Sequence, residues 1–433
     1  MAIRVLTVYH AGRDRQHRDR ERALRSEGAE LALLVPDAWP EPAAEQTLSD
    51  ESFPIIELAV RRPGDVNRHS YADGRRLREL IAEARPDVLD IREEPFSLAT
   101  RQLLAAADPA TPVVMYTAQN IDKRLPPPFS GYERRALRRA AGLYPCSRQA
   151  AAVARGKGFA GTVSVLPLGY DDTLFHAGAQ TLASEEITLL LAGRLVREKG
   201  IATAVRVLQR VHAVRPARLV LVGQGPLADS ARQLARTLDV ASQLELRPWL
   251  QGAELAALYR SAHVVLVPSR ATHTWAEQFG RVITEAQASG AVVAGYASGA
   301  IAEVAGEAGI IVAPGDFERL AQRVSDVVSD AEEFERRREA GRLSAARQTW
   351  HQVARTQLEL YEAVSGPGVA RRQLPRSPRA RRALAREEFG ATAAAAGGMR
   401  PFALPVLRNS GSPARALAVT IDAVAELAAR LHR

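Results

Sequence analysis

The sequence has 433 residues, of which 46% are hydrophobic and 25% charged, the composition of an ordinary soluble globular protein. This length exceeds what one hydrophobic core usually supports, so we expect two domains. No apolar run approaches the roughly 20 residues of a membrane-spanning helix, and the single cysteine, Cys146, excludes intramolecular disulfides and a thiolate metal cluster.

The net charge of +9 belongs almost entirely to the last part of the chain. Residues 366–433 hold twelve arginines against four acidic residues, a net charge of +8, which leaves +1 for the rest. A nearly neutral body lacks the basic surface that a nucleic-acid backbone requires, so we expect no nucleic-acid partner. An arginine-rich tail is usually solvated, and peripheral contact with an anionic membrane surface is the alternative.

Apolar runs alternate with helical patterns along the first part of the chain. Helices are expected, for example, at residues 73–86 and 132–142. Strands are expected at residues 3–9, 29–36, 53–60, 86–92, 112–117 and 163–168. Strands separated by helices of this length predict βαβ units and parallel sheets.

The same alternation resumes after residues 168–186, where both patterns lapse. Strands are expected there at residues 187–193, 217–223, 244–249, 263–269, 291–296 and 309–315. Runs such as "HVVLV" are apolar throughout, which is typical of sheets that are covered on both faces.

The last parallel unit is followed by a helical pattern and a tail of different composition. Residues 344–364 predict one long helix. Beyond residue 366 the chain is rich in Arg, Ala and Pro, so we expect it to be largely disordered, with a terminal amphipathic helix at residues 412–433. The expected domains are therefore residues 1–172 and 173–342, followed by the helix at 343–365 and the tail at 366–433.

The segment "TWAEQFGRVITEAQASG" joins the expected strands 263–269 and 291–296. It predicts a loop and then a helix, with Gly290 in the position that a left-handed C-cap prefers. The loop would lie at the carboxyl end of a parallel strand, where open α/β sheets bind ligands. Free N–H groups near Phe279 and Gly280, at the positive end of the helix, favour a phosphate there.

Two carboxylates, Glu277 and Glu285, stand eight residues apart in this segment. Eight residues of helix rise about 12 Å, whereas the two carboxylates of a glycosidase flank one bond at roughly 5–9.5 Å. The spacing therefore favours a grip on two ends of an extended ligand, such as a sugar at one end and a ribose at the other. Carboxylates suit that role because they accept hydrogen bonds from paired hydroxyls.

A second candidate loop occurs in "LLLAGRLVREKG", where a strand runs into Gly193 and is followed by Arg194 and Lys199. An Arg and a Lys at a strand end can hold both sides of a diphosphate without a metal. The next strand ends "LVLVGQGPL", so Gly223 and Gly225 offer a close backbone approach at the same sheet edge or serve only as a tight turn.

The segments "GRLVREKG", "LVGQGP", "EQFGRVITEA", "SGAIAEV" and "AGIIVAPGD" occur in the order and spacing of the retaining glycosyltransferases of family 4. The chain resembles that family closely over residues 187–316 and more loosely in the first half. The resemblance implies the GT-B fold, in which two Rossmann-like domains with parallel sheets face each other across a cleft. It also implies that the helix at 343–365 returns to the first domain.

The resemblance implies a role for each residue of the two loops. Arg194 and Lys199 would hold the diphosphate of a nucleotide-sugar donor in place of a metal, so no cofactor is expected. Glu277 would contact the transferred sugar and Glu285 the ribose. The catalytic set would be Glu277, Arg194 and Lys199, and the donor site would add Gly193, Gly223, Gly225, Phe279, Gly280 and Glu285. The expected reaction retains the configuration at the anomeric carbon.

The first domain departs from the family pattern. Its first loop, "YHAGRDRQHRDR", has only Gly12 where the family often has several glycines, and the position of an expected histidine holds Gln119 and Asn120. These three residues are the candidates for the acceptor side. Glu93 and Glu94 follow a strand and either face the interdomain cleft or are surface charge.

Two alternative functions stay open from the sequence. One is a sugar-nucleotide epimerase on a similar frame, and the other is a protein that binds a nucleotide sugar without catalysis. Release of nucleoside diphosphate that depends on an acceptor would separate a transferase from both. Because the first residues show no charged region followed by an apolar stretch and a cleavage site, we expect a cytoplasmic protein, or one peripheral to the inner face of the membrane.

Overall fold

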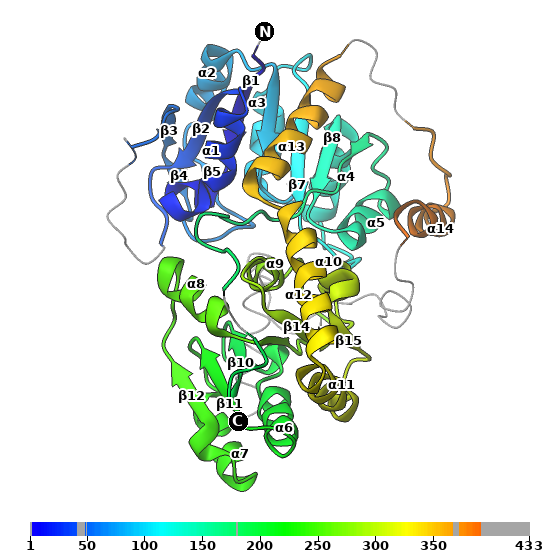
Figure 1. Ribbon diagram of the computed structural model, residues 1–433. Helices are drawn as coiled ribbons and strands as arrows, with labels where there is room; N and C mark the ends of the chain where they lie inside the picture. The colour runs from blue at the N-terminus through cyan, green and yellow to red at the C-terminus, as the bar shows by residue number, and fades with distance from the viewer. Residues whose placement is uncertain (1, 41–47, 49, 179–180, 367–371, 391–433) are drawn as a thin grey trace, which may run out of the picture.

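The computed structural model describes two α/β domains, each built on one parallel sheet (Figure 1). The described residues are all except 1, 41–47, 49, 179–180, 367–371 and 391–433. In the first domain the strand order is β3-β2-β1-β6-β7-β8-β9. These strands are β1 (Arg4–Val8), β2 (Glu30–Pro36), β3 (Ile55–Leu58), β6 (Val88–Ile91), β7 (Val113–Thr117), β8 (Gly142–Pro145) and β9 (Thr162–Val163). A small antiparallel pair, β4 (Val60–Arg61) and β5 (Ser70–Tyr71), stands apart.

The second domain repeats this design with the strand order β12-β11-β10-β13-β14-β15. Its strands are β10 (Ile187–Ala192), β11 (Ala217–Val222), β12 (Leu244–Arg247), β13 (Val264–Val267), β14 (Val292–Tyr296) and β15 (Ile310–Val312). All neighbouring strands in both large sheets pair in parallel. The expected α/β architecture of two parallel-sheet domains is therefore confirmed.

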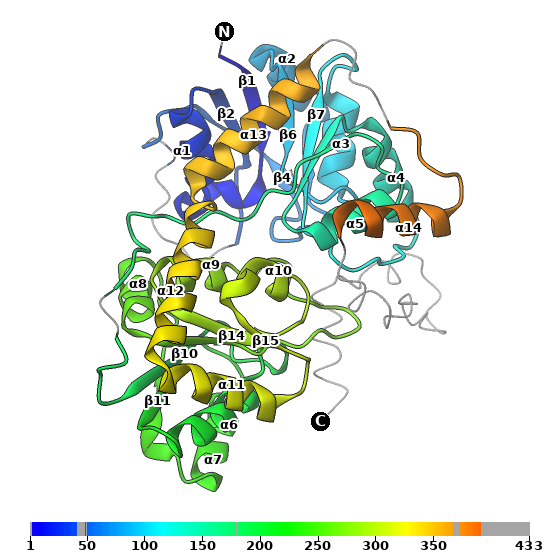
Figure 2. The same ribbon diagram turned by 45° about the vertical axis from the view of Figure 1, so that its right-hand side comes forward.

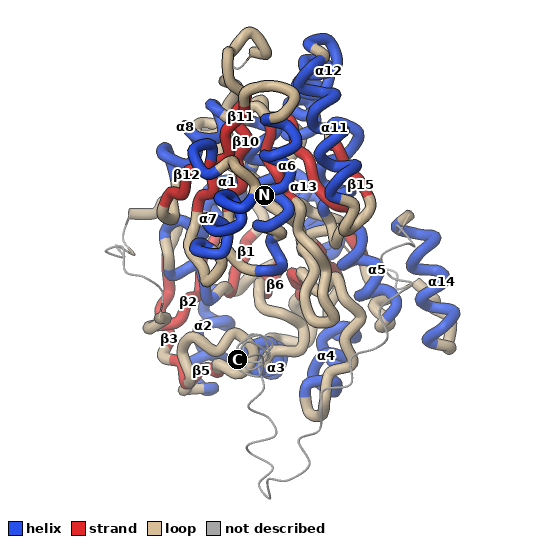
Figure 3. The backbone as a smooth tube through the Cα atoms, turned by 90° about the horizontal axis from the view of Figure 1, so that it is seen from below, coloured by secondary structure: helices blue, strands red, loops and turns tan. Residues whose placement is uncertain are grey.

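Helices cover both faces of each sheet, so that the strands lie inside (Figure 3). In the first domain these are α1 (Asp19–Ser26), α2 (Gly74–Ala84), α3 (Leu98–Ala106), α4 (Phe129–Arg139) and α5 (Arg148–Gly156). In the second they are α6 (Ile201–His212), α7 (Ala228–Thr237), α8 (Gly252–Ser261), α9 (Arg281–Ala288), α10 (Ile301–Ala305) and α11 (Phe317–Ser329). Alternate residues of β10 enter two separate cores: Leu189 and Leu191 one, Leu190 the other. Apolar side chains on both faces explain why these strands are continuous apolar runs.

The helix predicted at 343–365 begins too early: its main part is α13 (Trp350–Ser365), whereas residues 343–346 are the end of a preceding helix, α12 (Ala331–Ala346). The break lies at Thr349, whose hydroxyl accepts from the Gln352 N–H as an N-cap, while the Trp350 N–H donates to the Tyr170 carbonyl. In Figure 2, α12 lies along the second domain and α13 runs on across the first. α13 packs against α1 and β8, so the chain returns to the first domain after α12.

A second correction concerns the tail, which was expected to be largely disordered. Residues 378–389 form a helix, α14 (Pro378–Phe389), which packs on α5 of the first domain (Figure 1). Its start carries a Ser377 cap followed by Pro378, and its end carries Gly390 at φ 54°. Arg155 of α5 makes two bonds to Glu388, at 3.1 and 3.0 Å. The predicted terminal helix at 412–433 lies outside the described residues.

Two predicted elements near the end of the first domain are present with different bounds. The helix expected at 132–142 is α4 (Phe129–Arg139), and Gly142, the expected last residue of the helix, instead begins the buried strand β8, "GLYP", which the sequence did not predict. The strand expected at 163–168 is assigned only as β9, although the Ser164 and Leu166 N–H groups still donate to the Leu143 and Pro145 carbonyls at 3.0 Å. None of the helices in the described part of the chain is long and apolar enough to cross a membrane.

A buried polar network ties the returning helix α13 to the first sheet. Asp90 of β6 accepts hydrogen bonds from the Tyr144 hydroxyl at 2.6 Å, the Tyr361 hydroxyl at 2.7 Å and the Gln357 amide at 3.1 Å. Tyr361 and Gln357 belong to α13. Burial raises the pKa of Asp90 to about 6, against the opposing effect of the two tyrosine hydroxyls.

This raised pKa predicts a pH-dependent stability difference between the wild type and Asp90→Asn. A carboxyl whose pKa is higher in the folded state stabilises the fold when protonated, and that contribution is lost as the pH rises through about 6. Relative to the wild type, the neutral variant should gain about 2 kcal/mol of unfolding free energy between pH 4 and pH 7. Urea unfolding of both proteins across this range measures the difference, and a constant difference would contradict the assignment.

Candidate functional site

Glu277 lies in the loop between β13 and α9, and its carboxylate binds two groups of its own domain. Lys199 Nζ donates to Glu277 Oε2 at 2.7 Å, and Ser269 Oγ donates to the same oxygen at 3.2 Å. Lys199 comes from a short 3-10 turn (Arg197–Lys199) that follows β10, so the two residues meet although 78 positions separate them. Parallel strands that end at the same sheet edge bring these loops together.

The Lys199 ammonium also lies 5.2 Å from the ring centroid of Trp275. A cation at this distance from an aromatic face is attracted by the ring. The side chains of Lys199 and Glu277 are 19% and 11% exposed, so the pair is shielded but still accessible to a ligand. An anionic group that enters here meets a positive charge whose position is fixed from two sides.

Phe279 and Gly280 form the entry into α9. The Phe279 side chain is buried in the core, so only its backbone can face a ligand. Gly280 is the N-cap residue at φ 84°, a left-handed conformation that favours glycine. Its carbonyl accepts from the Ile283 N–H, while the N–H groups of the first turn point out of the helix. Gly290 closes the helix at φ 83°, as its sequence position predicts.

Glu285 lies in the second turn of α9 and is 5% exposed. Burial raises the pKa of its carboxyl, and the charge of Arg281 opposes this effect. Arg281 Nη2 donates to Glu285 Oε1 at 3.0 Å from one turn earlier on the helix. Glu277 and Glu285 therefore stand at two places on one loop-and-helix unit and have different partners, which fits distinct roles rather than a coupled pair.

The glycines of the two strand-end loops allow those loops to touch each other. Gly193, Gly223 and Gly225 have φ values of 146°, 137° and 157°. A Cβ on Gly223 would lie 2.0 Å from the Gly193 carbonyl oxygen, and one on Gly225 would lie 2.5 Å from that of Leu195. The close packing of the two loop backbones therefore explains why positions 223 and 225 are glycine, without any contribution from a ligand.

Arg194 follows Gly193 at the same edge and is exposed. Its guanidinium has no ion-pair or hydrogen-bond partner within the part of the chain that the structure describes. Trp249 is a residue that the sequence analysis did not single out. It is 56% exposed and follows β12, whose Arg247 carbonyl accepts from the Gly223 N–H at 3.1 Å. A large aromatic directly after a strand at this edge was the available signal.

The three acceptor-side candidates occupy different environments. Gly12 packs on Leu33, and its carbonyl accepts from Arg18 Nε at 2.6 Å. The Gln119 side-chain oxygen accepts from Lys157 Nζ at 2.6 Å. Asn120 is 5% exposed, and its amide donates to the Glu277 carbonyl at 2.8 Å across the domain interface. The structure therefore brings only Asn120 to the Glu277 loop.

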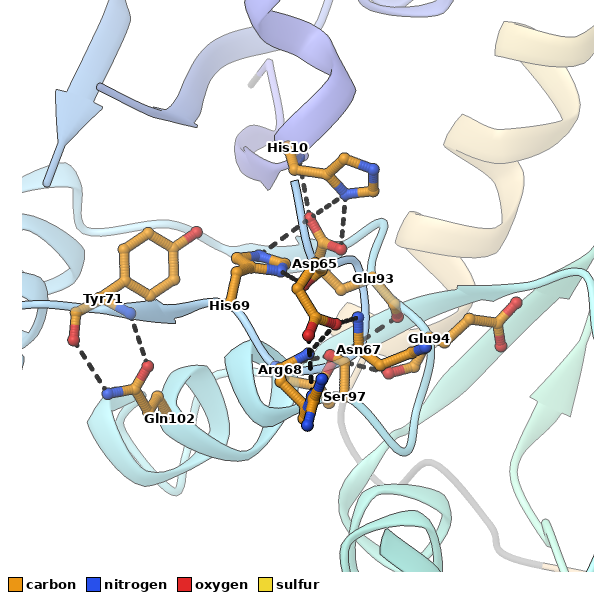
Figure 4. Close-up of polar contacts among 11 residues, drawn as sticks. His10, Asp65, Asn67, Arg68, His69, Tyr71, Glu93, Glu94, Ser97 and Gln102 are labelled. Atoms are coloured by element: carbon orange, nitrogen blue, oxygen red, sulfur yellow. Dashed lines mark hydrogen bonds and ion pairs between the residues drawn. The ribbon is translucent and has the colours of Figure 1, made fainter. Parts of the chain in front are cut away.

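Glu93 is 2% exposed and Glu94 is partly buried, so the interpretation of Glu93 as surface charge is wrong. Glu93 accepts from the His10 N–H at 2.8 Å and from His10 Nδ1 at 2.7 Å, with His69 Nε2 at 3.9 Å (Figure 4). Burial alone would raise the pKa of Glu93, but the charges and hydrogen bonds of these histidines hold it below its usual value. Trp39 packs on His10, with ring centroids 4.7 Å apart.

This histidine–glutamate cluster lies where β1 and β6 end, on the sheet edge of the first domain. The loop that supplies His69 is held there by Asp65, which accepts from the Asn67 and Arg68 N–H groups (Figure 4). The cluster is not evident from the sequence, because His10 and His69 are distant from Glu93 along the chain. The position of Glu93 directly after a strand was the only signal.

Comparison with known proteins places both domains in described families. Residues 175–344 match the model of the glycosyl transferases group 1, and residues 18–174 match that of Glycosyltransferase Family 4. The D-inositol 3-phosphate glycosyltransferase of Stackebrandtia nassauensis is 34% identical over 237 residues, which are 50% of this chain and 52% of that protein. The chain thus spans about half the length of the curated relatives it matches.

Solved structures share the arrangement of the whole described body. A glycosyltransferase from Rickettsia africae matches with a TM-score of 0.66 at 16% identity, over 85% of this chain and 100% of that one. HepE from Anabaena, in complex with UDP and glucose, matches with a TM-score of 0.59 at 16% identity, over 84% and 100%. These likenesses show the GT-B fold that the sequence predicts.

Proposed function

We propose that this chain transfers a sugar from a nucleoside diphosphate sugar to an acceptor hydroxyl. The proposal starts from the chain's membership of the glycosyltransferases of group 1 and family 4. The observation that carries the proposal is the Lys199–Glu277 pair, which stands before the N-terminus of α9. Positive charge and free N–H groups meet there, and both favour a phosphate. A complex of HepE contains UDP, which makes uridine nucleotides the first donors to test.

The proposed chemistry follows from the charges at this edge. Arg194 and Lys199 bind the diphosphate and neutralise the negative charge that develops as the bond between the sugar and the phosphate breaks. In this proposal the two cations take the place of a divalent metal. Glu277 lies beside the sugar, Glu285 accepts hydrogen bonds from the ribose, and Trp249 stacks on the base.

We propose retention of the anomeric configuration, with the acceptor attacking from the face that the phosphate leaves. The bond between the acceptor oxygen and the anomeric carbon forms as the bond to the phosphate breaks. The acceptor proton passes to the leaving phosphate oxygen, so no separate base is needed. Cytoplasmic location and a membrane contact through residues 366–433 stay predictions from the sequence.

Calorimetric titration with UDP, GDP and ADP in the presence of a chelator tests the donor site. We expect one of the three nucleotides to bind the wild type. The Arg194→Ala variant should bind that nucleotide about 10- to 100-fold more weakly, because a charge-assisted hydrogen bond to phosphate is lost. Arg232→Ala is the matched control, since Arg232 lies on α7 and pairs only with Asp229 within the described residues. Trp249→Ala should lower the affinity for the nucleotide but leave the affinity for pyrophosphate, which has no base, unchanged. Absence of binding to all three nucleotides would contradict the proposal.

A further inference from the structure

Asn120 makes a direct hydrogen bond between the two domains at the proposed catalytic loop. It follows β7 of the first domain and is 5% exposed. Its side-chain amide donates to the main-chain carbonyl of Glu277, in the second domain, at 2.8 Å. The Asn120 side chain therefore links the first domain to the Glu277 loop of the second.

The Glu277 carbonyl is fixed from both sides. The Ala300 N–H of the second domain donates to it at 2.9 Å. Gly299, at φ 57°, lies so close that a Cβ there would come within 2.2 Å of the same oxygen. The carboxylate of Glu277 is held separately by Lys199 and Ser269. The side chain of Glu277 is thus held by groups of its own domain, whereas the position of its main-chain carbonyl depends partly on Asn120 of the first domain.

Other contacts hold the Glu277 loop, between β13 and α9, against the first domain. Cys146, after β8, lies 3.5 Å from the Gln278 carbonyl through its Sγ. Ala118 and Cys146 share an apolar cluster with Phe279 and Ile283. The Arg148 N–H donates to Glu303 Oε1 at 2.7 Å, which is an interdomain bond that does not involve Glu277. Separation of the domains would break all these contacts together.

We propose that Asn120 is a positioning residue, which makes the orientation of Glu277 depend on the approach of the two domains. This inference rests on the proposed function. When the domains are apart, the Glu277 carbonyl loses one of its two donors and the loop is less constrained, so donor can bind while transfer is slow. When they meet, the Asn120 bond fixes the backbone on which the Glu277 carboxylate stands.

The test compares steady-state transfer and nucleotide binding in Asn120→Ala, Asn120→Asp and Glu303→Ala. We expect both Asn120 variants to lower kcat about 10- to 100-fold, with the Kd of the nucleoside diphosphate unchanged within twofold, because the phosphate contacts stay intact. Glu303→Ala removes an interdomain bond without touching Glu277 and should have a smaller effect on kcat. Thermal unfolding of each variant shows whether it is folded.

Asn120→Asp adds a signature that a purely structural role would not give. An ionised carboxylate repels the Glu277 carbonyl, but a protonated one can donate to it, so the activity of this variant relative to the wild type should rise as the pH falls. The inference would be overturned if the Asn120 variants kept the wild-type kcat, or if they lost nucleotide affinity as much as kcat. It would also be overturned if Glu303→Ala lowered kcat as much as the Asn120 variants do. Absence of transfer by the wild type would instead overturn the proposed function.

Discussion

Lys199→Ala is expected to lower kcat for sugar transfer about 10³-fold. Lys199 supplies the positive charge nearest the Glu277 carboxylate, at 2.7 Å, and in the proposed mechanism it stabilises the departing phosphate. Loss of one such preorganised donor costs roughly 10²–10³ in rate. The variant also leaves the largely buried Glu277 carboxylate without its cation, which disturbs the position of that group further. Release of nucleoside diphosphate at saturating donor measures the effect.

Lys199→Arg is the matched variant for this prediction. It keeps the charge, but the planar guanidinium cannot occupy the place of a compact ammonium between Glu277 and Trp275. We expect an intermediate rate. Thermal unfolding distinguishes a local effect from loss of the fold. A folded Lys199→Ala protein with wild-type kcat would contradict the role of this residue.

Glu285→Ala is expected to weaken donor binding about 10²-fold with a smaller change in kcat. A carboxylate that accepts from two ribose hydroxyls makes two hydrogen bonds to a charged group, each worth about 1.5 kcal/mol or more. Because burial raises the pKa of Glu285, protonation begins at a higher pH than for an exposed glutamate. Donor affinity of the wild type should therefore fall as the pH is lowered through that raised pKa.

Glu285→Gln provides the control for the pH dependence. Its side chain has the same shape but cannot ionise. This variant should bind the donor weakly, and residue 285 should no longer contribute any pH dependence to the affinity. Calorimetry at a series of pH values measures both proteins. A wild-type affinity that follows the same pH profile as that of Glu285→Gln would show that Glu285 does not bind the donor as a carboxylate.

The fold could be predicted largely from the sequence because its strands are short apolar runs buried on both faces. The prediction at 263–269, for example, contains β13 at Val264–Val267. The errors arose where local signals are weak or hidden. β8 is four residues long and directly follows a helical pattern, and the break before α13, which Thr349 caps, lies inside a stretch whose residues all read as helical.

The site could be predicted only where its residues follow strands. Lys199 and Glu277 each lie after a parallel strand, so their meeting at one sheet edge follows from the topology. The Asn120 contact depends on how one domain sits on the other, and the histidines around Glu93 come from separate loops. Such contacts are set by tertiary packing, which periodicity and spacing do not contain. The same holds for α14, whose contacts with the first domain include the Arg155–Glu388 pair.

The most direct test of the central claim is turnover of a panel of nucleoside diphosphate sugars with and without candidate hydroxyl acceptors. The products are followed by nucleotide release and by NMR of the anomeric carbon. We expect acceptor-dependent release of nucleoside diphosphate and a product with the anomeric configuration of the donor, both formed about 10³-fold more slowly by Lys199→Ala. No turnover of any donor, or a nucleotide sugar changed only in the configuration of its sugar, would contradict the account.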